Sequence, residues 1–226
     1  KTRRGLLGRI LDGKSGGGLA YGYRIRADHI GEREIVDTEA MVVRRIFKDY
    51  ANGISPRKIA KALNEEAIPG PGGRNWGDTT IRGQVDRGTG ILNNDLYIGR
   101  LVWNRCSYVK NPKTGKRLAR PNPPEQWETV DIPELRIIDD ELWQQVKVRQ
   151  QSVRLEMSRD DSGNALNRVH RRKYLFSGLL KCGVCGAGYT ITGKDRYGCA
   201  SHRSKGICPN TRSIKRQDIE DRILSG

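Results

Sequence analysis

Four of the chain's five cysteines fall within residues 182–208, and this cluster constrains the fold more than any other feature of the sequence. A Cys-x2-Cys pair places two thiolates about one tight turn apart, so both can bind one tetrahedral Zn²⁺ through bonds of about 2.3 Å. Between the two cysteine pairs, residues 188–192 and 195–198 have the pattern of two hairpin strands with a turn at Gly193-Lys194. The cluster therefore predicts a zinc ribbon with one structural Zn²⁺, whose expected ligands are Cys182, Cys185, Cys199 and Cys208.

Four other interpretations of the cysteine cluster have to be weighed. Two disulfides would require an oxidising compartment, and the sequence shows no secretory signal peptide. A redox Cys-x2-Cys would need a βαβ context, which the glycine-rich flank of Cys185 does not suggest. His202 is a candidate ligand in place of Cys199 or Cys208. Four thiolates already close a structural site, so a catalytic zinc with an open position is not expected.

The charge of the chain indicates a polyanionic partner. The 226 residues carry a net charge of +16, with 42 Lys and Arg against 26 Asp and Glu. Two blocks are especially basic: residues 100–120 hold seven Lys or Arg and no acid, and residues 168–216 hold twelve and one acid. Such blocks are typical of nucleic-acid contacts, although a basic surface can also serve solubility or a membrane surface. No long apolar run is present, so we expect no membrane partner and a cytoplasmic, DNA-associated protein.

The N-terminal residues 1–12 resemble the last turns of a basic helix that arrives from an upstream domain, which suggests a fragment of a larger protein. Residues 13–22 follow with five glycines, too many for a helix. This segment can be a flexible linker. A phosphate-binding loop is a weaker alternative, because the required strand and helix do not flank it. A third interpretation is a thin segment that lies in a DNA minor groove, with Lys14 on phosphates.

Residues 35–85 have the pattern of three short helices. The first should be capped by Asp37 or Thr38, the second by Ser55 with a first-turn proline, and the third by Asp78 over residues 79–85. This order predicts a helix-turn-helix arrangement. The polar residues of the third helix could then contact base edges or phosphates; they are Thr79, Thr80, Arg82 and Gln84. The alternative is an ordinary three-helix packing unit with a solvated polar face.

Residues 104–124 predict a basic β-hairpin whose function would be phosphate contact, which gives affinity rather than sequence choice. Its expected contact residues are Lys110, Lys113, Lys116 and Arg117. Further short strands are expected at 127–130 and 135–138, and Asp139 should cap a last helix. Trp103, Trp127 and Trp143 are expected in the core rather than as base-stacking platforms, and Cys106 as a plain thiol.

A series of modest motifs spans nearly the whole chain. They are Gly13-Lys-Ser with Tyr21-Gly-Tyr23, Ile54-Ser-Pro with Ile59-Ala-x-x-Leu63-Asn64, Trp76 with Thr79-Thr-Ile-Arg82, Leu92-Asn-Asn with Tyr97-Ile-Gly99, Ile138-Asp139 with Leu142-Trp143, and Phe176-Ser-Gly-Leu-Leu-x-Cys182-Gly-x-Cys185-Gly186. In this order they resemble the C-terminal DNA-binding region of a large serine recombinase, of the phage-integrase type. Residues 84–90 form a segment that is shorter in many members of that family.

The resemblance implies an α+β fold with four parts. Residues 1–23 would be the end of a catalytic-domain helix and a glycine-rich linker, 24–152 a helix-turn-helix-containing recombinase domain with short β-strands, 153–170 a linker, and 171–226 a small zinc-ribbon domain with the start of a helix. In the ribbon domain, residues 174–180 are expected to form its first apolar strand. A basic loop of the ribbon would add DNA contacts through Lys194, Arg196, His202, Arg203 and Lys205.

The function implied by the resemblance is sequence-specific binding of double-stranded DNA at a recombination site. Strand exchange would use a serine of an upstream domain, together with other recombinase subunits, so no residue of this chain is assigned to catalysis. The coiled-coil arm that leaves the ribbon in this family is expected to be absent here. Two other functions stay open: a zinc-ribbon transcription regulator, and a protein-binding zinc module whose charge serves only solubility.

Overall fold

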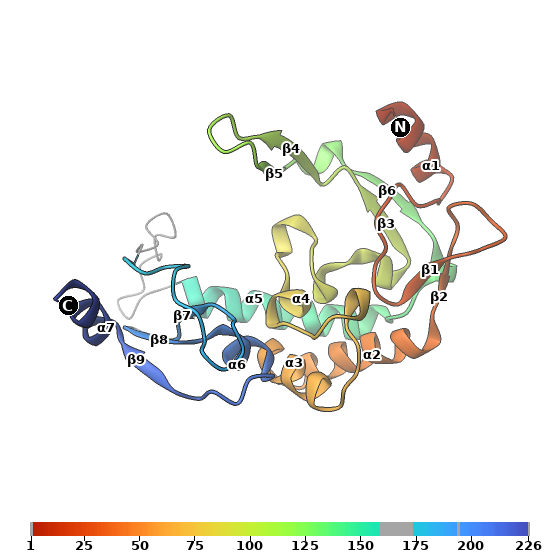
Figure 1. The fold of residues 1–226 in the computed structure, drawn as a ribbon. Coiled ribbons are helices and arrows are strands. Elements are labelled where there is room, and N and C mark those ends of the chain that lie inside the picture. The colour runs from red at the N-terminus through yellow and green to blue at the C-terminus, as the bar shows by residue number, and fades with distance from the viewer. Residues whose placement is uncertain (1, 159–173, 194, 226) are drawn as a thin grey trace. The chain divides into compact units, whose positions relative to one another are not determined.

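The computed structural model describes residues 2–158, 174–193 and 195–225 (Figure 1). The chain divides into two compact units. Unit 1 comprises residues 1–54 and 79–148, and unit 2 comprises residues 55–78 and 149–226. Short helices and short antiparallel strands alternate in both units, so the predicted α+β class is confirmed.

The strands are short, and the longest described helix, α5 (Asp140–Ser158), has 19 residues. The helices are α1 (Arg3–Leu11), α2 (Asp37–Ala51), α3 (Pro56–Glu65), α4 (Asp78–Arg82), α5 (Asp140–Ser158), α6 (Ala200–Lys205) and α7 (Arg216–Leu224). The strands are β1 (Tyr23–Ile25), β2 (Arg33–Ile35), β3 (Arg100–Trp103), β4 (Cys106–Lys110), β5 (Arg117–Pro121), β6 (Glu128–Asp131), β7 (Tyr189–Ile191), β8 (Arg196–Cys199) and β9 (Ser213–Lys215). All described sheets are antiparallel: β1 pairs with β2, β3 with β6, β4 with β5, and β8 lies between β7 and β9.

Aromatic side chains form the centre of unit 1. Tyr23 stacks on Tyr97 with ring centroids 5.8 Å apart, and Phe47 lies between Tyr97 and Trp143 at 6.0 and 5.7 Å. The Tyr23 hydroxyl lies 2.9 and 2.8 Å from the carbonyl oxygens of Leu96 and Leu135, which satisfies its polar end inside the core. These contacts join segments that are distant in sequence, and the contacts therefore define the fold of unit 1.

Helix α2 has the apolar stripe expected from its sequence, with Val43, Ile46 and Phe47 fully buried. Its predicted cap is wrong. Val36 occupies the N-cap position without a side-chain hydrogen bond, and the helix begins at Asp37. The first-turn Glu39 instead accepts a hydrogen bond of 2.6 Å from the backbone N–H of Gly22, which attaches the glycine-rich segment to this helix.

Helix α3, in unit 2, begins as predicted, because the Ser55 hydroxyl accepts from the backbone N–H of Lys58 and proline occupies the first turn. Asn64 forms a reciprocal pair with the buried Trp76: its side chain donates to the Trp76 carbonyl at 2.9 Å and accepts from the Trp76 N–H at 2.8 Å. The same amide of Asn64 donates to the carbonyl of Lys205 at 2.7 Å. Helix α3 is therefore bonded to the C-terminal end of α6.

Several predicted elements differ from the structure. The third helix ends at Arg82 rather than residue 85, because Gly83 has φ +53° and turns the chain out of the helix. Residues 135–138 form no strand; both Ile137 and Ile138 donate their N–H groups to the Tyr97 carbonyl instead. Residues 174–180 are turns rather than a first ribbon strand. Among the described residues, the third ribbon strand is β9, which the sequence had not predicted.

Two further predictions concern connecting segments. The linker expected from residue 153 is helical as far as Ser158, where α5 ends, and residues 159–173 lie outside the described part of the chain. The ribbon loop expected to carry basic contacts is in part helix α6. Asp139 does cap α5, because its carboxylate accepts from the Leu142 N–H at 2.7 Å. The hairpin predicted over residues 104–124 is confirmed as β4 and β5.

Candidate metal centre and nucleic-acid interface

The four predicted cysteine ligands converge in unit 2. Their sulfur atoms all lie within 4.8 Å of one another, with Cys182 to Cys208 at 4.0 Å and Cys185 to Cys199 at 3.5 Å. A tetrahedral zinc with bonds of about 2.3 Å would place its sulfur ligands about 3.8 Å apart. A disulfide would need sulfur atoms about 2.05 Å apart. The four positions therefore fit a zinc ion and not a pair of disulfides.

The backbone shapes the first half of the cluster. The N–H of Cys182 donates to the Ala187 carbonyl at 2.7 Å, and the N–H of Gly186 donates to the Cys182 carbonyl at 2.8 Å. Gly186 has φ +70°, a conformation that glycine adopts without strain. The resulting tight turn directs Cys182 and Cys185 toward one point. Cys199 ends strand β8, and Cys208 follows helix α6.

The surroundings of the thiols shift their pKa values in opposite directions. A hydrogen bond from the Asn210 side chain lowers the pKa of Cys182 to about 6, and a backbone hydrogen bond from Cys185 acts in the same direction. Burial, by contrast, raises the pKa of Cys199. Four crowded sulfurs cannot all ionise without a nearby positive charge. A bound divalent metal would remove this conflict, because it deprotonates its thiol ligands.

Two polar residues surround the sulfur atoms. Asn210 donates its amide to the Cys182 sulfur at 3.3 Å and to the Tyr189 hydroxyl at 2.8 Å. His202 has its Nδ1 atom 2.7 Å from the Cys208 carbonyl. Of the described residues, the group placed to hold a metal consists of the four cysteines, so His202 supports the loop of Cys208 rather than replacing a ligand. Sequence spacing gave no signal for Asn210.

Helix α4 and the loop that follows it expose most of the residues proposed to contact DNA. Thr79, Arg82 and Gln84 are exposed, and Thr80 is half-buried. The segment after the helix is a tight loop, closed by the pairing of Gln84 with Thr89. Asn93, which is buried, donates to the Arg82 and Thr89 carbonyls at 2.8 Å each. The exposed side chains therefore extend from a backbone that is fixed by internal hydrogen bonds.

The β4–β5 hairpin projects from the rest of unit 1 (Figure 1). Lys110 pairs with Arg117 at the end of its ladder. The Asn111 carboxamide oxygen accepts from the Lys113 N–H at 2.9 Å and thereby shapes the turn. The four predicted basic residues of the hairpin, Lys110, Lys113, Lys116 and Arg117, are all exposed. Beside them Tyr108, Val109 and Leu118 are exposed, which the sequence pattern did not predict.

The base of this hairpin is held by tryptophan and asparagine contacts. Arg105 lies over the Trp127 ring at 4.9 Å and forms an ion pair with Asp95. The indole N–H of Trp127 donates to the Asn122 carbonyl at 3.0 Å. Trp143 is buried, as predicted, whereas Trp103 and Trp127 are only half-buried. The prediction that all three lie in the core is therefore correct for Trp143 alone.

The glycine-rich segment is attached to its surroundings through Ser15. This serine is buried, and its N–H donates to the Gly31 carbonyl at 2.7 Å. Its hydroxyl accepts from the Gly17 N–H at 3.3 Å. The neighbouring Lys14 is half-buried, and its N–H donates to the Arg9 carbonyl. Residues 14–17 are thus ordered by contacts within unit 1.

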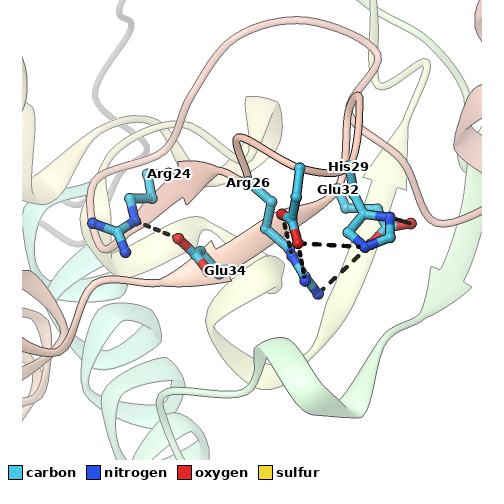
Figure 2. Close-up of polar contacts among 6 residues, drawn as sticks. Arg24, Arg26, His29, Glu32 and Glu34 are labelled. Atoms are coloured by element: carbon cyan, nitrogen blue, oxygen red, sulfur yellow. Dashed lines mark hydrogen bonds and ion pairs between the residues drawn. The ribbon is translucent and has the colours of Figure 1, made fainter.

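The β1–β2 hairpin carries an exposed cluster in which basic and acidic groups pair (Figure 2). Arg26 binds Asp28 at 2.7 Å and lies 3.9 Å from Glu32, while His29 lies 3.4 Å from Asp28. The hydrogen bond from Arg26 lowers the pKa of Asp28 to about 2. A similar ion pair joins Arg24 to Glu34. Since these charges neutralise one another, this hairpin contributes little to the basic surface.

The basic residues predicted for the ribbon have different environments. Arg196 is exposed and donates to the Ser213 hydroxyl at 2.9 Å. Arg203 is half-buried, with one guanidinium nitrogen bonded to the Ile191 carbonyl. Lys205 is half-buried, and Lys194 lies outside the described residues. The expected contact loop therefore has one exposed arginine, beside basic side chains that also hold the ribbon together.

Comparisons with known proteins give two family matches along the chain. A family model described as Recombinase matches residues 37–152, and one described as the recombinase zinc beta ribbon domain matches residues 175–226. A Bacillus subtilis (strain 168) protein named "Putative DNA recombinase" is 28% identical over 207 residues. That match covers 87% of this chain and 36% of the relative, so the chain spans about a third of the relative's length.

Two solved structures match the chain with low structural similarity. One is a crystal structure of an LSR–DNA complex, with 18% identity and a TM-score of 0.42 over 98% of this chain and 64% of that chain. The other concerns the sequence requirements of the Listeria innocua prophage attP site, with 17% identity, a TM-score of 0.39, and coverage of 98% and 85%. Both TM-scores lie below 0.5, so the two domain models are the stronger comparison. Within the described residues, no helix has both the length and the apolar character needed to cross a membrane.

Proposed function

Because this chain belongs to the recombinase family, with its zinc beta ribbon domain following the recombinase domain, we propose that it is the DNA-binding region of a site-specific recombinase. In this role it binds double-stranded DNA at a recombination site. The whole protein then integrates, excises or transposes DNA with a catalytic serine outside this sequence, together with other recombinase subunits. We assign no catalytic residue to this chain and place the protein in the cytoplasm of a bacterium, encoded by the cell or by a phage.

The observation that supports this function best is the presence of two different modules on one basic chain. The recombinase domain carries the exposed residues of α4 and the β4–β5 hairpin. The ribbon domain carries the four-thiol cluster and further basic residues. Two tethered modules raise affinity through effective concentration when the DNA sites they contact are within reach of each other. A recombination half-site longer than one module can contact fits this arrangement.

The ribbon would hold one structural Zn²⁺ through Cys182, Cys185, Cys199 and Cys208. When bound, the ion supplies folding free energy rather than chemistry on DNA, because all four positions around it are protein thiolates. Asn210 and the backbone turn at Gly186 orient the ligands. The limits proposed for the domains stay at residues 24–152 and 171–226.

The DNA contacts would divide by type. Arg82 on α4 and Gln84 in the loop after it have the side chains that pair with guanine and adenine edges in a major groove, with Thr79 and Thr80 beside them. The exposed lysines of the hairpin would contact phosphates, which adds affinity for any sequence. Lys14 and its glycine-rich neighbours would lie in a minor groove. Arg196, Arg203 and Lys205, with His202 and Lys194, would complete the contacts of the ribbon.

Selection of bound duplexes from a random DNA pool, with and without a zinc chelator, tests this function. A long selected site that loses protection at one end when zinc is removed would support DNA recognition by both modules. A short site unaffected by the chelator would favour a regulator that reads DNA through the helices alone. No enrichment at any salt concentration would contradict the proposal and favour a protein-binding module.

A further inference from the structure

Unit 2 contains a basic groove of about 410 Å³, hereafter the α3–ribbon groove, between helix α3 and the zinc ribbon. This volume is far above the roughly 30 Å³ that one water molecule occupies. Five Lys or Arg residues and no Asp or Glu line the groove. The five are Arg57, Lys58, Lys61, Arg203 and Arg212. Of these five residues, only Arg203 was predicted from the sequence to contact DNA.

The two walls of the groove are joined by specific contacts. The Asn64 amide donates to the carbonyls of Trp76 and Lys205, so one side chain attaches α3 to the end of α6. Gly206 follows α6 with φ +72°. A Cβ atom at Gly206 would lie 2.6 Å from the Lys61 Cγ atom, so only glycine permits this approach. The groove is therefore a product of close packing between the two elements.

The charges of the groove are available to a ligand. Arg57, Lys58 and Arg212 are all exposed. Lys61 lies 3.5 Å from Glu65, but this pair is exposed on both sides and therefore contributes little. Arg203 is fixed by its bond to the Ile191 carbonyl, which directs a rigid guanidinium to the groove wall. Five cations close together repel one another, and an extended anion relieves that repulsion.

We propose that the α3–ribbon groove binds the sugar–phosphate backbone of duplex DNA, with helix α3 and the ribbon contacting one continuous run of phosphates. This inference rests on the proposed function and adds a contact surface to it. The lining offers lysine and arginine with the hydroxyls of Thr192 and Ser213, groups that bind phosphate oxygens. A groove with cations on both walls matches a polymer that carries a charge about every 1.7 Å along its axis. Helix α3 is thereby a DNA-positioning element.

The test measures affinity for a 30-base-pair duplex of random sequence by fluorescence anisotropy, across a series of KCl concentrations, with the zinc-loaded chain. We expect Lys58→Gln and Arg212→Gln each to weaken DNA binding several-fold. Each should also lower the salt slope, the steepness with which log affinity falls with log salt concentration, by about 0.9. The double variant should lower this slope by about 1.8. Lys48→Gln on α2 and Lys181→Gln in the ribbon are matched controls, since each removes one exposed charge outside the groove. We expect less than a twofold loss for these controls. Zinc content and thermal unfolding confirm that each variant folds.

Zinc removal distinguishes a shared groove from two independent contacts. Because the ribbon wall depends on its metal site, Lys58→Gln should have no more effect than its control in the chelated chain. A loss that persists at full size without zinc would overturn the shared groove. Groove variants that match their controls while the unaltered chain binds DNA would also overturn it, and would leave the proposed function intact. An unaltered chain that fails to bind any duplex contradicts the proposed function itself.

Discussion

At the scale of single residues, the thiol cluster was the part of the site that sequence spacing predicted most completely. The Cys-x2-Cys spacing imposes a tight turn whatever the surroundings, so it places Cys182 and Cys185 close together in any fold. The residues around the cluster follow from tertiary contacts. Asn210 donates to the Cys182 sulfur, and His202 contacts the Cys208 carbonyl. No rule of sequence spacing predicts that either Asn210 or His202 would contact the cluster.

Asn210→Ala should weaken zinc binding. The substitution removes the hydrogen bond to the Cys182 sulfur that lowers the pKa of this thiol, and also the bond to the Tyr189 hydroxyl. Outer contacts of this kind contribute roughly 10- to 100-fold to metal affinity. Competition with a chromogenic chelator measures the loss. Thr211→Ala, at the adjacent exposed position, is the control, and equal zinc affinity of both variants would contradict the role of Asn210.

Lys147 should make the stability of unit 1 depend on pH. Burial lowers the pKa of Lys147 to about 8, and Asp95 only partly opposes this effect. In the unfolded chain the pKa returns to about 10.4. Between pH 8 and 10 the unfolded state therefore binds more protons than the folded state, so the free energy of unfolding should rise with pH. Below pH 8 both states are protonated, and this dependence should vanish.

Urea unfolding at pH 7.5, 8.5 and 9.5 measures this dependence. The ammonium of Lys147 lies 4.2 Å from the centre of the Trp143 ring, and Lys147→Met keeps an apolar side chain beside that ring. In this variant the free energy of unfolding should no longer rise between pH 8 and 10. Measurements stop below pH 10, because burial raises the pKa of Tyr21 to about 12 and adds an opposing dependence there. An unchanged slope in Lys147→Met would assign the effect to another group.

At the scale of elements, helix α3 was predicted well because its apolar stripe and its cap agree, whereas for α2 the apolar stripe was predicted correctly and the cap was not. Errors arose where a tertiary contact determined the backbone. Helix α4 ends early because Gly83 packs against the backbone at Thr89, a contact between residues that no periodicity describes. Strand β9 contains three residues, too few for an alternation pattern. Strands β1 and β2 were missed for the same reason.

Gly83→Ala should destabilise unit 1 by about 1–3 kcal/mol or more. Its φ is +53°, and an added Cβ would lie 1.6 Å from the Thr89 carbonyl oxygen, so the backbone would have to move. Urea unfolding gives the change in free energy. Gly8→Ala, inside α1 with no atom within 4 Å of the new methyl group, should be neutral or stabilising by up to about 1 kcal/mol. Similar losses at both positions would contradict the assigned role of Gly83.

Helix α4 and the β4–β5 hairpin should differ in what they contribute to DNA binding. Arg82→Ala should lower affinity for a selected site by about 1–3 kcal/mol and hardly change affinity for random duplex, because a base contact is lost. Lys113→Ala, in the exposed turn of the hairpin, should weaken both duplexes alike and lower the salt slope by about 0.9. Anisotropy titrations on both duplexes measure the ratio of the affinity for the selected site to the affinity for random duplex. If this ratio is the same for the two variants, α4 and the hairpin do not differ in what they contribute to DNA binding.

At the scale of the whole molecule, the net charge of +16 is unevenly placed. The β1–β2 hairpin pairs Arg24 and Arg26 with acids, whereas the β4–β5 hairpin and the α3–ribbon groove have lysines and arginines in excess. Composition predicted a polyanionic partner but could not predict which surfaces would stay basic. That depends on which charges the fold brings together. The grouping of α3 with the ribbon was equally inaccessible, because about 140 residues separate Asn64 from Lys205.

Zinc removal, or Cys182→Ser, should therefore unfold the ribbon and also release helix α3, while the core of unit 1 persists. Ribbon folding is coupled to metal binding, and α3 loses its bond to Lys205 when α6 unfolds. Hydrogen exchange should show lost protection in residues 56–65 and 182–208, and retained protection in α2 and in β3. Cys106→Ser, outside the cluster, is the control and should change neither region. Protection that survives in α3 would mean that this helix does not depend on the ribbon, and a loss throughout α2 would mean that the two units unfold as one.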